Sequence, residues 1–439
     1  MPTNPASTPQ RRIPEGLRAF RHRDYRLFWF SQLLSLTGTW LQSLAQSWLV
    51  LTLTNSPIAL GMISILQFGP TLVLGLAGGV IADRYPKRRI LLVTQSAIFV
   101  ITSILAILVV TGTVQLWNIY AAAFAFGIVN AIDMPTRQSF VSDMVGHEDL
   151  GNAVALNSAL FNTTRIIGPA LAGILLSTVG AGICFALNAV TYLPTIAALA
   201  LMNTNGDPAP ASSSQSPIDR LRGGLAYVRQ TPMVLMPIVL VGLVATFGLN
   251  FNVWAPLLAR DVLDIGASGF GVLMSAIGVG SLTGALTLAF RGRAPSLRRI
   301  LLMAGMFGAA ELALAAATHD AVPLPVVMAL MGLIGFTMST TMAQANTLVQ
   351  TSSPHALRGR VMSIYMTVFA GATPLGAAVA GLAAEWGGAP LAVALGGFVA
   401  LTAAIGVALW SRSGANRTAS GTLHLTGPES IAGPRSEPR

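Results

Sequence analysis

The stretch GGVIADRYPKRRILLVTQSAIFVITSILAILVV (Gly78–Val110) sets one acid and four bases directly before the charge-free run Ile90–Val110. About 20 mostly apolar residues are enough for a helix to cross a bilayer. Of the 439 residues in the chain, 53% are hydrophobic and 10% are charged, whereas soluble domains carry about 25% charged residues. The run therefore predicts a membrane-spanning helix, and the composition predicts a protein made largely of such helices.

Twelve long apolar runs follow one another and cover most of the chain. Transmembrane β-strands would instead alternate in polarity over about 10 residues, and no such alternation is present in the sequence. We therefore predict an all-α integral membrane protein with twelve transmembrane helices. The predicted spans are 27–52, 57–82, 89–111, 116–136, 154–178, 181–203, 233–257, 268–290, 299–318, 322–348, 361–384 and 389–411.

The first 26 residues are polar and rich in Arg, and the first apolar run has full span length without a small-residue cleavage site. This pattern is unlike that of a cleavable export signal, so we expect the first helix to be retained. The single cysteine, Cys184, lies in an apolar run with no disulfide partner and no cluster of metal ligands, so we expect it to be a packing residue and predict no metal site.

The basic residues are distributed unevenly between the two predicted sides of the membrane. If the N-terminus is cytoplasmic, all but two of the 26 Lys and Arg residues fall on the cytoplasmic side. The exceptions are Arg260, on the opposite side, and Arg165, inside a span. Positive charge concentrates in cytoplasmic loops, so this distribution predicts that both termini lie in the cytoplasm. The net charge of +10 then requires no nucleic-acid partner.

An internal repeat relates the two halves of the sequence. A shift of 208 residues places Gln138–Gly173 on Asn346–Gly381 and matches His147 with His355 and Gly173 with Gly381, while a shift of 210 matches Arg88-Arg89-Ile90-Leu91-Leu92 with Arg298-Arg299-Ile300-Leu301-Leu302. We therefore predict two pseudo-symmetric six-helix bundles, at 27–203 and 232–411. Two parallel repeats around a midplane site form a transporter architecture.

The predicted bundles are flanked and joined by polar segments. Residues 1–26 form a cytoplasmic N-terminal segment, and residues 204–231 form a cytoplasmic linker that contains a short amphipathic helix at Ile218–Val228. The tail, 412–439, is rich in Ser, Thr, Gly and Pro, and we expect it to be disordered.

The charged stretch carries a family resemblance. The pattern GxxxDRxxKR, formed by Gly79, Asp83, Arg84, Lys87 and Arg88, resembles the loop 2–3 signature of the major facilitator superfamily. Two departures exist: Pro86 stands where the family usually has Gly, and the second-half counterpart around Arg291 lacks the acid. The resemblance implies a gating loop that works as a latch in the first half alone.

Three longer blocks, Arg26–Gly61, Asn130–Val141 and Asn152–Gly173, are similar to the subfamily of the enterobactin exporter, a bacterial siderophore efflux group. Within the third block, Gly168–Gly173 resembles the end of the superfamily's antiporter motif, although Thr164 replaces its upstream glycine. The resemblance implies a protein of the bacterial inner membrane that exports a siderophore or an amphipathic drug-like molecule, driven by a proton gradient.

The acid and the bases of the loop have separate interpretations. Asp83 lies at a membrane edge, where it can meet a helix N-terminus or an Arg from the facing half, so we favour a latch. Arg84, Lys87 and Arg88 either take part in gating or merely set topology and bind anionic lipid head groups.

Ionisable residues inside spans are costly and therefore suggest function. Arg165 shares one helix face with Ser158 and Asn162, where its guanidinium would hold an anionic or catecholate-like group. The alternative is a structural partner for Asp133 or for backbone carbonyls near a helix end.

Two acids are candidates for proton coupling. Asp133 and Arg137 are at i and i+4 around Pro135, and a carboxylate there can exchange protons as a cavity opens. The plainer interpretation is a kinked helix end with an intrahelical ion pair. Glu311 is the acid lying well within the spans of the second half. It is either buried and neutral or a proton carrier, and the resemblance places its helix outside the central cavity.

Uncharged polar residues recur on three spans at helical spacing. Such stripes usually face protein or water rather than lipid, so they are cavity candidates, although hydrogen bonding between helices explains them equally simply. The stripes are Ser35, Thr39, Gln42 and Gln46; Phe247, Asn250 and Trp254; and Thr337, Thr341 and Gln344.

The sequence contains no HExxH, no GxGxxG after a strand and no GxxxxGK[ST], which argues against an enzyme or a bound cofactor. We predict a monomeric secondary transporter that works by alternating access and whose partners are a small-molecule substrate and membrane lipids. The alternatives are an importer or lipid flippase on the same scaffold, and a non-transporting membrane sensor or assembly protein.

Overall fold

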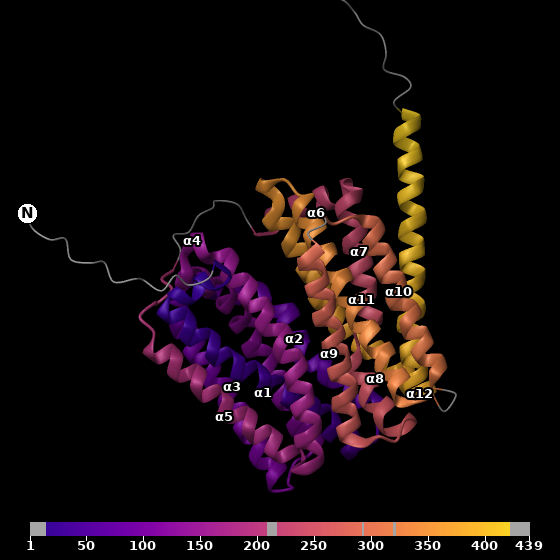
Figure 1. The fold of residues 1–439 in the computed structure, drawn as a ribbon. Helices are drawn as coiled ribbons and strands as arrows, with labels where there is room; N and C mark the ends of the chain where they lie inside the picture. The colour runs from indigo at the N-terminus through magenta and orange to yellow at the C-terminus, as the bar shows by residue number, and fades with distance from the viewer. Residues whose placement is uncertain (1–14, 209–216, 292–293, 319–321, 422–439) are drawn as a thin grey trace, which may run out of the picture.

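The computed structural model describes residues 15–208, 217–291, 294–318 and 322–421, and the regular elements of these residues are all helices (Figure 1). In chain order they are η1 (Glu15–Arg21), α1 (Arg23–Thr54), α2 (Pro57–Arg84), α3 (Lys87–Val110), α4 (Leu116–Thr178), α5 (Gly180–Leu201), α6 (Pro217–Gln230), α7 (Pro232–Phe247), α8 (Phe251–Leu257), the short π-helix η2 (Leu258–Val262), α9 (Gly266–Arg291), α10 (Leu297–Ala317), α11 (Leu324–Thr351) and α12 (His355–Gly421).

Ten helical stretches of the described chain are long and apolar enough to cross a membrane. Two of them are the halves of α4, which bends at Gly146, and α7, α8 and η2 together make another. The stretch Leu357–Ser413 holds 57 residues and breaks at Gly387 and Gly388, so it crosses twice. With α1, whose 32 residues include many polar side chains, the passes number twelve. The predicted all-α membrane fold is confirmed.

Local signals in the sequence set several helix ends. Ser56 precedes α2, and its Oγ accepts a hydrogen bond from the N–H of Ala59, while Pro57 occupies the first turn. Among the turns with a positive φ are those at Gly180 (φ 80°) and at Gly388 (φ 70°), where glycine adopts this conformation without strain. These two glycines are 208 residues apart, which is the shift of the internal repeat.

Glycine pairs bring helices of the two halves into backbone contact. We call α1–α5 the N-group and α7–α12 the C-group. A Cβ on Gly173 of α4 would lie 2.8 Å from the Cα of Gly271 in α9, and one on Gly381 of α12 would lie 3.6 Å from the Cα of Gly61 in α2. The shift of 208 relates Gly173 to Gly381, and the shift of 210 relates Gly61 to Gly271. The two contacts are therefore equivalent under the internal repeat.

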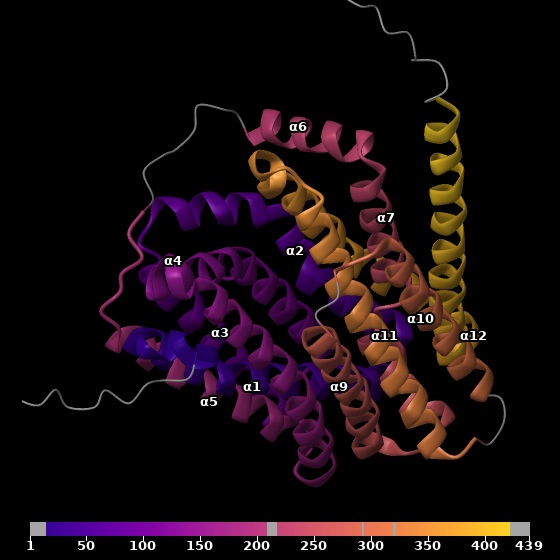
Figure 2. The same cartoon turned by 45° about the horizontal axis from the view of Figure 1, so that its top comes forward.

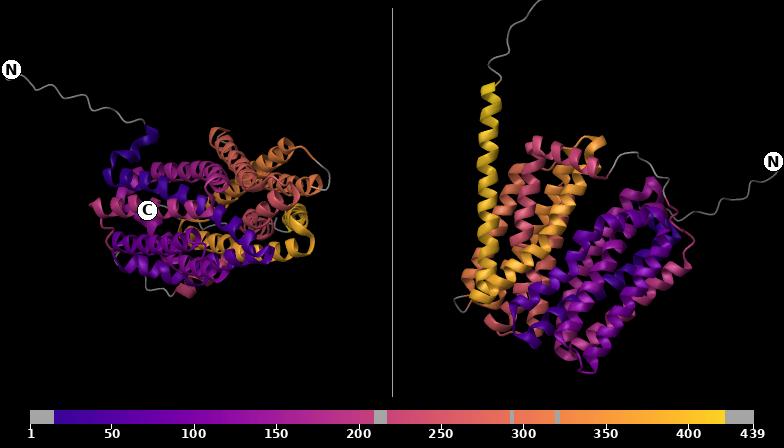
Figure 3. Two further views of the ribbon diagram at one scale, coloured as in Figure 1. Left: turned by 90° about the horizontal axis from the view of Figure 1, so that it is seen from below. Right: turned by 180° about the vertical axis from the view of Figure 1, so that it is seen from behind.

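The two groups touch near one end and diverge toward the other (Figures 1 and 3). We call the end that carries Arg84, Lys87 and Arg298 the basic end, and the other the opposite end. Between α2 and α12, close approaches extend from Gly61 to Leu72, and Leu72 contacts Gly371. Between α4 and α9, they extend as far as the approach of Gly278 to the Arg165 carbonyl. Contact between the groups therefore covers the half of the helices nearest the opposite end.

A charged side chain adds to this closure at the opposite end. Arg260 of η2 donates hydrogen bonds from Nη1 to the carbonyl of Leu51, at 3.0 Å, and to Oδ1 of Asn55, at 2.9 Å. Both acceptors belong to the C-terminal end of α1, where the Leu51 carbonyl also accepts from the N–H of the C-cap residue Asn55. Asp261 accepts from Arg260 Nε at 2.5 Å and holds the guanidinium in place. The C-group thus caps a helix of the N-group.

The polar flanks pack against the basic end. Asp24, at the start of α1, accepts hydrogen bonds from the N–H of Asn203, from the N–H and hydroxyl of Thr204, and it lies near Arg23. Burial opposes its charge, but these hydrogen bonds outweigh burial and lower the pKa of Asp24. Figure 2 shows α6, which contains the amphipathic helix expected at 218–228, lying across the basic end of the C-group.

The chain beyond the last span continues as a helix. α12 ends at Gly421, past residue 412, where the sequence predicted disorder to begin. In Figures 1 and 3 this last part of α12 stands clear of the other helices. Residues 422–439 of the predicted tail, and residues 1–14 and 209–216 of the other polar segments, lie outside the described residues.

We predict that Arg260→Ala weakens the closure of the opposite end. Hydrogen bonds to a charged group contribute about 1.5–3 kcal/mol, and because Arg260 is partly exposed we expect the lower part of this range, about a tenfold shift toward an open opposite end. The readout is the distance between spin labels at Val179→Cys and Glu385→Cys in a Cys184→Ser background, measured by pulsed electron resonance.

Arg299→Ala is the matched control, because Arg299 bonds to Ser296 and Ala294 within the C-group. Equal distance distributions in Arg260→Ala and Arg299→Ala would show that Arg260 does not hold the two groups together.

Candidate functional site

A cavity of about 210 Å³ lies inside the N-group, at the level where the two groups are in contact. Residues of α1, α2, α3, α4 and α5 line it, and Asn252 of α8 closes it from the C-group. Sites for drug-sized ligands usually measure about 300–1,000 Å³. The cavity is therefore large enough for one ring or one arm of such a ligand.

The lining of the cavity is uncharged and combines amides with aromatic rings. None of its lining residues, all of which the structure describes, is Asp, Glu, Lys, Arg or His. Amides offer both donors and acceptors, and rings offer flat apolar faces for stacking. The arrangement suits a neutral aromatic group that bears hydroxyl or carbonyl oxygens. The amides are Gln42, Gln46, Gln67, Asn188 and Asn252, and the rings are Trp40, Phe68, Phe126, Phe161 and Tyr192.

Of the predicted cavity residues, Thr39, Gln42 and Gln46 line this cavity. Gln42 Oε1 accepts a hydrogen bond from Asn188 Nδ2 at 2.6 Å, which fixes the amide between α1 and α5. Gln46 is 8% exposed and has no hydrogen bond to the described residues. Its amide is therefore free to bind a ligand.

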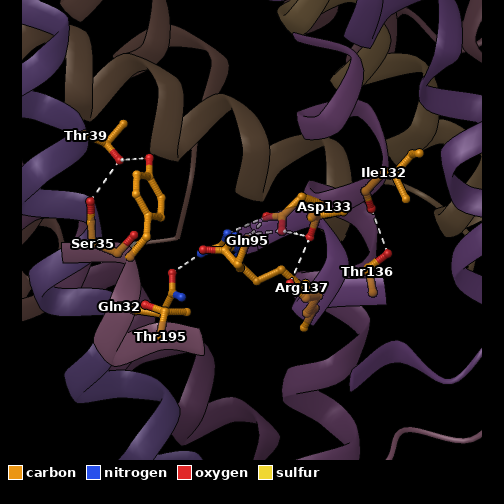
Figure 4. Close-up of polar contacts among 12 residues, drawn as sticks. Gln32, Ser35, Thr39, Gln95, Ile132, Asp133, Thr136, Arg137 and Thr195 are labelled. Carbon is orange, nitrogen blue, oxygen red and sulfur yellow. Dashed lines mark hydrogen bonds and ion pairs between the residues drawn. The ribbon is translucent and has the colours of Figure 1, made fainter. Parts of the chain in front are cut away.

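Asp133 and Arg137 form the predicted i, i+4 ion pair, but in a buried network rather than at an open helix end (Figure 4). Asp133 is 1% exposed. Its Oδ1 accepts from Thr94 Oγ1 at 2.6 Å and from Gln95 Nε2 at 2.8 Å, and its Oδ2 accepts from Arg137. Arg137 Nη1 also donates to Gln32 Oε1. The pair thus connects α3, α4 and α1.

One face of α1 leads from this network to the cavity. Gln32, which binds Arg137, lies one and two turns before Ser35 and Thr39 on the same helix. Thr39 Oγ1 donates to the carbonyl of Ser35 at 2.9 Å and lies 3.3 Å from the hydroxyl of Tyr192 (Figure 4). Thr39 and Tyr192 both line the cavity. A ligand that contacts Thr39 in the cavity is therefore two turns of α1 away from Gln32, which belongs to the charged network.

Arg165 does not line this cavity, and neither does Asn162. Arg165 is half-buried, and its Nη2 lies 3.6 Å from Sδ of Met338 in the C-group. It forms no ion pair within the described residues, and Asp133, its suggested partner, is paired with Arg137 instead. Asn162 donates to the carbonyl of Ser158 in its own helix. Arg165 therefore stands as an uncompensated charge between the two groups.

Asn250 and Trp254 are also absent from the lining. The sequence predicted one continuous helix over 233–257, but α7 ends at Phe247 and α8 begins at Phe251. Asn250 Nδ2 donates to the carbonyl of Thr246 at 2.8 Å, and Trp254 is 1% exposed. Asn252 of α8 lines the cavity instead.

Gln344 and Glu311 are buried in the C-group away from the cavity. Gln344 is 3% exposed and Glu311 is 0% exposed. Within the described residues, Oε1 of Gln344 and both carboxyl oxygens of Glu311 have no hydrogen-bond partner. Buried polar atoms without partners are rare in proteins and call for an explanation.

Two bases of the predicted gating loop, Lys87 and Arg88, contact other helices of the N-group. Lys87 is 7% exposed, and its Nζ lies 2.7 Å from Oδ2 of Asp143 on α4. Arg88 donates from Nε to the carbonyl of Leu199 and from Nη2 to that of Ala200, both at 2.6 Å. These contacts join α3 to α4 and to the end of α5.

The acid of the same loop has a different setting. Asp83 and Arg84 are exposed at the basic end, where the groups diverge, and neither forms a hydrogen bond or ion pair with the described residues. A Cβ on Gly79 would meet no atom within 4 Å. In this conformation the loop leaves Asp83 available for a partner on the facing group.

Sequence analysis missed most of the lining, including Asn188 and Tyr192 of α5. These two are at i and i+4, and Thr191 and Thr195 add further polarity to that span. This signal was present in the sequence. The aromatic residues gave no signal, because Trp40, Phe126 and similar residues are common on lipid-facing surfaces as well as in cavities.

Comparison with known proteins gives several relatives that match 82% of the chain. The staphyloferrin A transporter of Staphylococcus aureus is 26% identical over 369 residues, covering 82% of this chain and 89% of that protein. The multidrug efflux pump Tap of Mycolicibacterium fortuitum is 27% identical over 371 residues, with coverage of 82% and 89%. The enterobactin exporter EntS of Escherichia coli is 26% identical over 368 residues, with coverage of 82% and 85%.

The fold is also that of solved transporters. A crystal structure of a POT family transporter in complex with a thioalcohol conjugated peptide is 12% identical, with a TM-score of 0.71, and it covers 89% of this chain and 96% of its own. The family model described as transmembrane secretion effector matches residues 15–429. The chain therefore belongs to the transmembrane secretion effector family of the major facilitator superfamily, and it is a multi-pass secondary transporter rather than an enzyme.

Proposed function

We propose that this protein exports a small aromatic molecule, most simply a siderophore or an amphipathic drug-like compound, in exchange for protons. The observation that carries the proposal is the uncharged cavity of amides and rings, whose lining residue Thr39 lies two turns of α1 from Gln32, the residue that accepts from Arg137 of the buried Asp133–Arg137 pair. Export is supported by the names of two relatives, an efflux pump and an enterobactin exporter, and a third relative is named as a transporter of the siderophore staphyloferrin A.

The basic end faces the cytoplasm in this proposal, because positive charge concentrates in cytoplasmic loops. Both termini then lie in the cytoplasm of a bacterial cell, and the conformation described is the inward-facing one. Alternating access would move the bundles at 27–203 and 232–411 as two bodies joined by residues 204–231. Each chain supplies both bundles, so one copy suffices for transport.

The substrate group that enters the cavity is neutral and aromatic. No acid lines the cavity, so a cationic dye would lose its hydration there without gaining a counter-charge. A catechol ring would find amide partners for its hydroxyl groups and rings for stacking. Arg165, half-buried between the groups, would attract an anionic part of the same ligand.

Proton exchange would take place at Asp133. In the conformation described, the Asp133 carboxyl accepts hydrogen bonds from Arg137 and from two further donors. A ligand that holds α1 in this position would keep Gln32, and hence Arg137, beside Asp133, so its binding would favour the form of the carboxyl that has lost its proton. After the ligand has left and Arg137 has withdrawn, the buried carboxylate would be unpaired and would take up a proton.

Asp83 would close the basic end in the outward-facing state. When the groups approach each other there, the carboxylate can meet a helix N-terminus or an Arg of the C-group. Lys87 and Arg88 hold the loop on the N-group and so place Asp83 for this contact. Arg84 remains exposed, where it can bind lipid head groups.

We predict that Asp133→Asn abolishes substrate-dependent proton release. Purified protein in detergent receives a catecholate siderophore, a macrolide or a cationic dye, and the released protons are followed with a pH indicator. Wild type should release protons with the catecholate, while Asp133→Asn should fall to the level of protein-free buffer because its amide cannot titrate.

Asp207→Asn, a change of an exposed acid at the basic end, is the control and should behave as wild type. If Asp133→Asn releases as many protons as wild type, the exchange site is elsewhere. Release triggered by the dye alone would exclude the proposed ligand class.

We predict that Gln46→Ala weakens catecholate binding about threefold to tenfold, the loss expected for one hydrogen bond of about 0.5–1.5 kcal/mol. Gln344→Ala removes the same side chain from a buried place outside the cavity and should leave the affinity unchanged. Titration calorimetry measures both. Equal losses in the two variants would place the ligand outside this cavity.

We predict that Asp83→Asn shifts the protein toward the inward-facing state, by up to about tenfold if the latch contributes up to about 1.4 kcal/mol. Spin labels at Tyr85→Cys and Arg358→Cys in a Cys184→Ser background report the opening of the basic end. Asp207→Asn is again the control, and a latch is excluded if both variants give the wild-type distances.

A further inference from the structure

Glu311 is a buried acid that the proposed exchange at Asp133 does not use. It lies in the middle of α10, in the C-group, and its side chain is completely buried. Neither carboxyl oxygen has a hydrogen-bond partner among the described residues. An isolated charge in a low-dielectric interior is very costly, and such a group neutralises instead. The carboxyl of Glu311 therefore carries a proton in this conformation.

Glycines of α12 make room for this carboxyl. A Cβ on Gly396 would lie 3.0 Å from Oε2 of Glu311 and 2.6 Å from the carbonyl oxygen of Phe247, and one on Gly397 would lie 2.9 Å from Cβ of Glu311. Any larger residue at Gly396 would displace the acid. The carboxyl thus lies beside the C-terminal end of α7, close to the Phe247 carbonyl.

That end of α7 is a break inside a membrane-spanning segment. α7 stops at Phe247 and α8 starts at Phe251, so the last carbonyls of α7 lose their helical partners. Asn250 Nδ2 donates to Thr246 O at 2.8 Å and to Phe247 O at 3.3 Å. Freed backbone groups at membrane depth need such partners. A protonated carboxyl is one more donor within the same pocket.

No counter-charge faces Glu311 from the helices packed around it. α7, α8 and α11 contain no Asp, Glu, Lys, Arg or His. On α10 the bases are Arg298 and Arg299, about 18 Å away along the helix at 1.5 Å per residue. On the spanning part of α12, between Arg360 and Arg412, the titratable side chains are Tyr365, bonded to the Met342 carbonyl, and Glu385, which is exposed. Only hydration or a change in packing can therefore stabilise the charged form.

We propose that Glu311 is a second proton-binding site, located in the C-group and coupled to the break in α7. The proton is bound in the conformation described, and it leaves when movement of α7 or α12 admits water to the carboxyl. The inference rests on the proposed alternating access, because it assigns the bound proton to one of the two conformations. Asp133 belongs to the N-group, so the two acids would give each bundle a proton site.

The proposal fixes the sign of a pH effect. A proton that is bound in the conformation open at the basic end stabilises that conformation at low pH. Raising the pH removes the proton and favours the conformation in which the carboxyl is hydrated. Packing alone would give no such effect, because a permanently neutral carboxyl is insensitive to pH.

The test compares wild type, Glu311→Gln and Glu385→Gln in a Cys184→Ser background and without substrate. Glu385 is an exposed acid on α12, next to the break at Gly387 and Gly388, so its change to Gln is the matched control. Infrared spectra are recorded between about pH 6 and about pH 9, the interval in which buried carboxyl groups are known to titrate. Spin labels at Tyr85→Cys and Arg358→Cys report the opening of the basic end in the same samples.

We expect a C=O stretching band of a protonated carboxyl in wild type and Glu385→Gln that weakens as the pH rises and is missing in Glu311→Gln. We expect the basic end to close with rising pH in the first two proteins and to stay open at every pH in Glu311→Gln. A band that is unchanged by Glu311→Gln, or equal pH responses of the labels in all three proteins, would overturn the proposal.

The wild-type spectra keep the test decisive if Glu311→Gln does not fold, because a wild type without a titrating carboxyl band contradicts the proposal by itself. No substrate enters these measurements. If the protein does not export a catecholate but Glu311 titrates as expected, the proposed function fails and this inference stands. If the protein exports a catecholate but Glu311 shows no pH response, this inference alone fails.

Discussion

Backbone contact at two glycine pairs, Gly173 with Gly271 and Gly61 with Gly381, determines how the rest of this structure is arranged. Between helices in lipid, hydrophobic burial gives little net attraction, so association depends on close packing, which small residues allow. Because both contacts lie nearer the opposite end, the helices of the two groups cross there and diverge beyond it. The cavity, the exposed loop at Asp83 and the reach of Arg260 to α1 all follow from that crossing.

The chain handles its intramembrane charges in three different ways. Asp133 is paired with Arg137, Arg165 contacts a sulfur atom at the boundary between the groups, and Glu311 is enclosed without a hydrogen-bond partner among the described residues. The cost of a buried charge rises in that order, so each residue responds differently when water enters. Each of the three side chains lies beside a residue of another helix: Gln32 of α1 near the Asp133–Arg137 pair, Met338 of α11 near Arg165, and Gly396 of α12 near Glu311. A movement of these helices relative to one another would therefore change the surroundings of all three.

The cavity accounts for one part of a ligand only. Its lining is uncharged, and its volume of about 210 Å³ suits one ring, so residues outside it would contact the rest of a larger ligand. Relatives at 26–27% identity are named for a siderophore and for multidrug efflux. A fold positions a site without fixing its substrate, so the amides and rings of the cavity, rather than the fold, indicate which ligands suit this chain.

By itself, the sequence determined the membrane class, the twelve helical passes and the repeat, because apolar length, charge-free runs and fixed offsets between glycines are local or pairwise properties of the chain. It also placed Asp133 four residues from Arg137. Only the tertiary structure decided that this pair is buried against Thr94 and Gln95, and that Asn252 rather than Asn250 meets the cavity. Periodicity assumes an unbroken helix, whereas α7 breaks where packing against other helices permits it. Cavity lining depends on which faces meet across helices distant in sequence, and that information appears only when all of them are packed together.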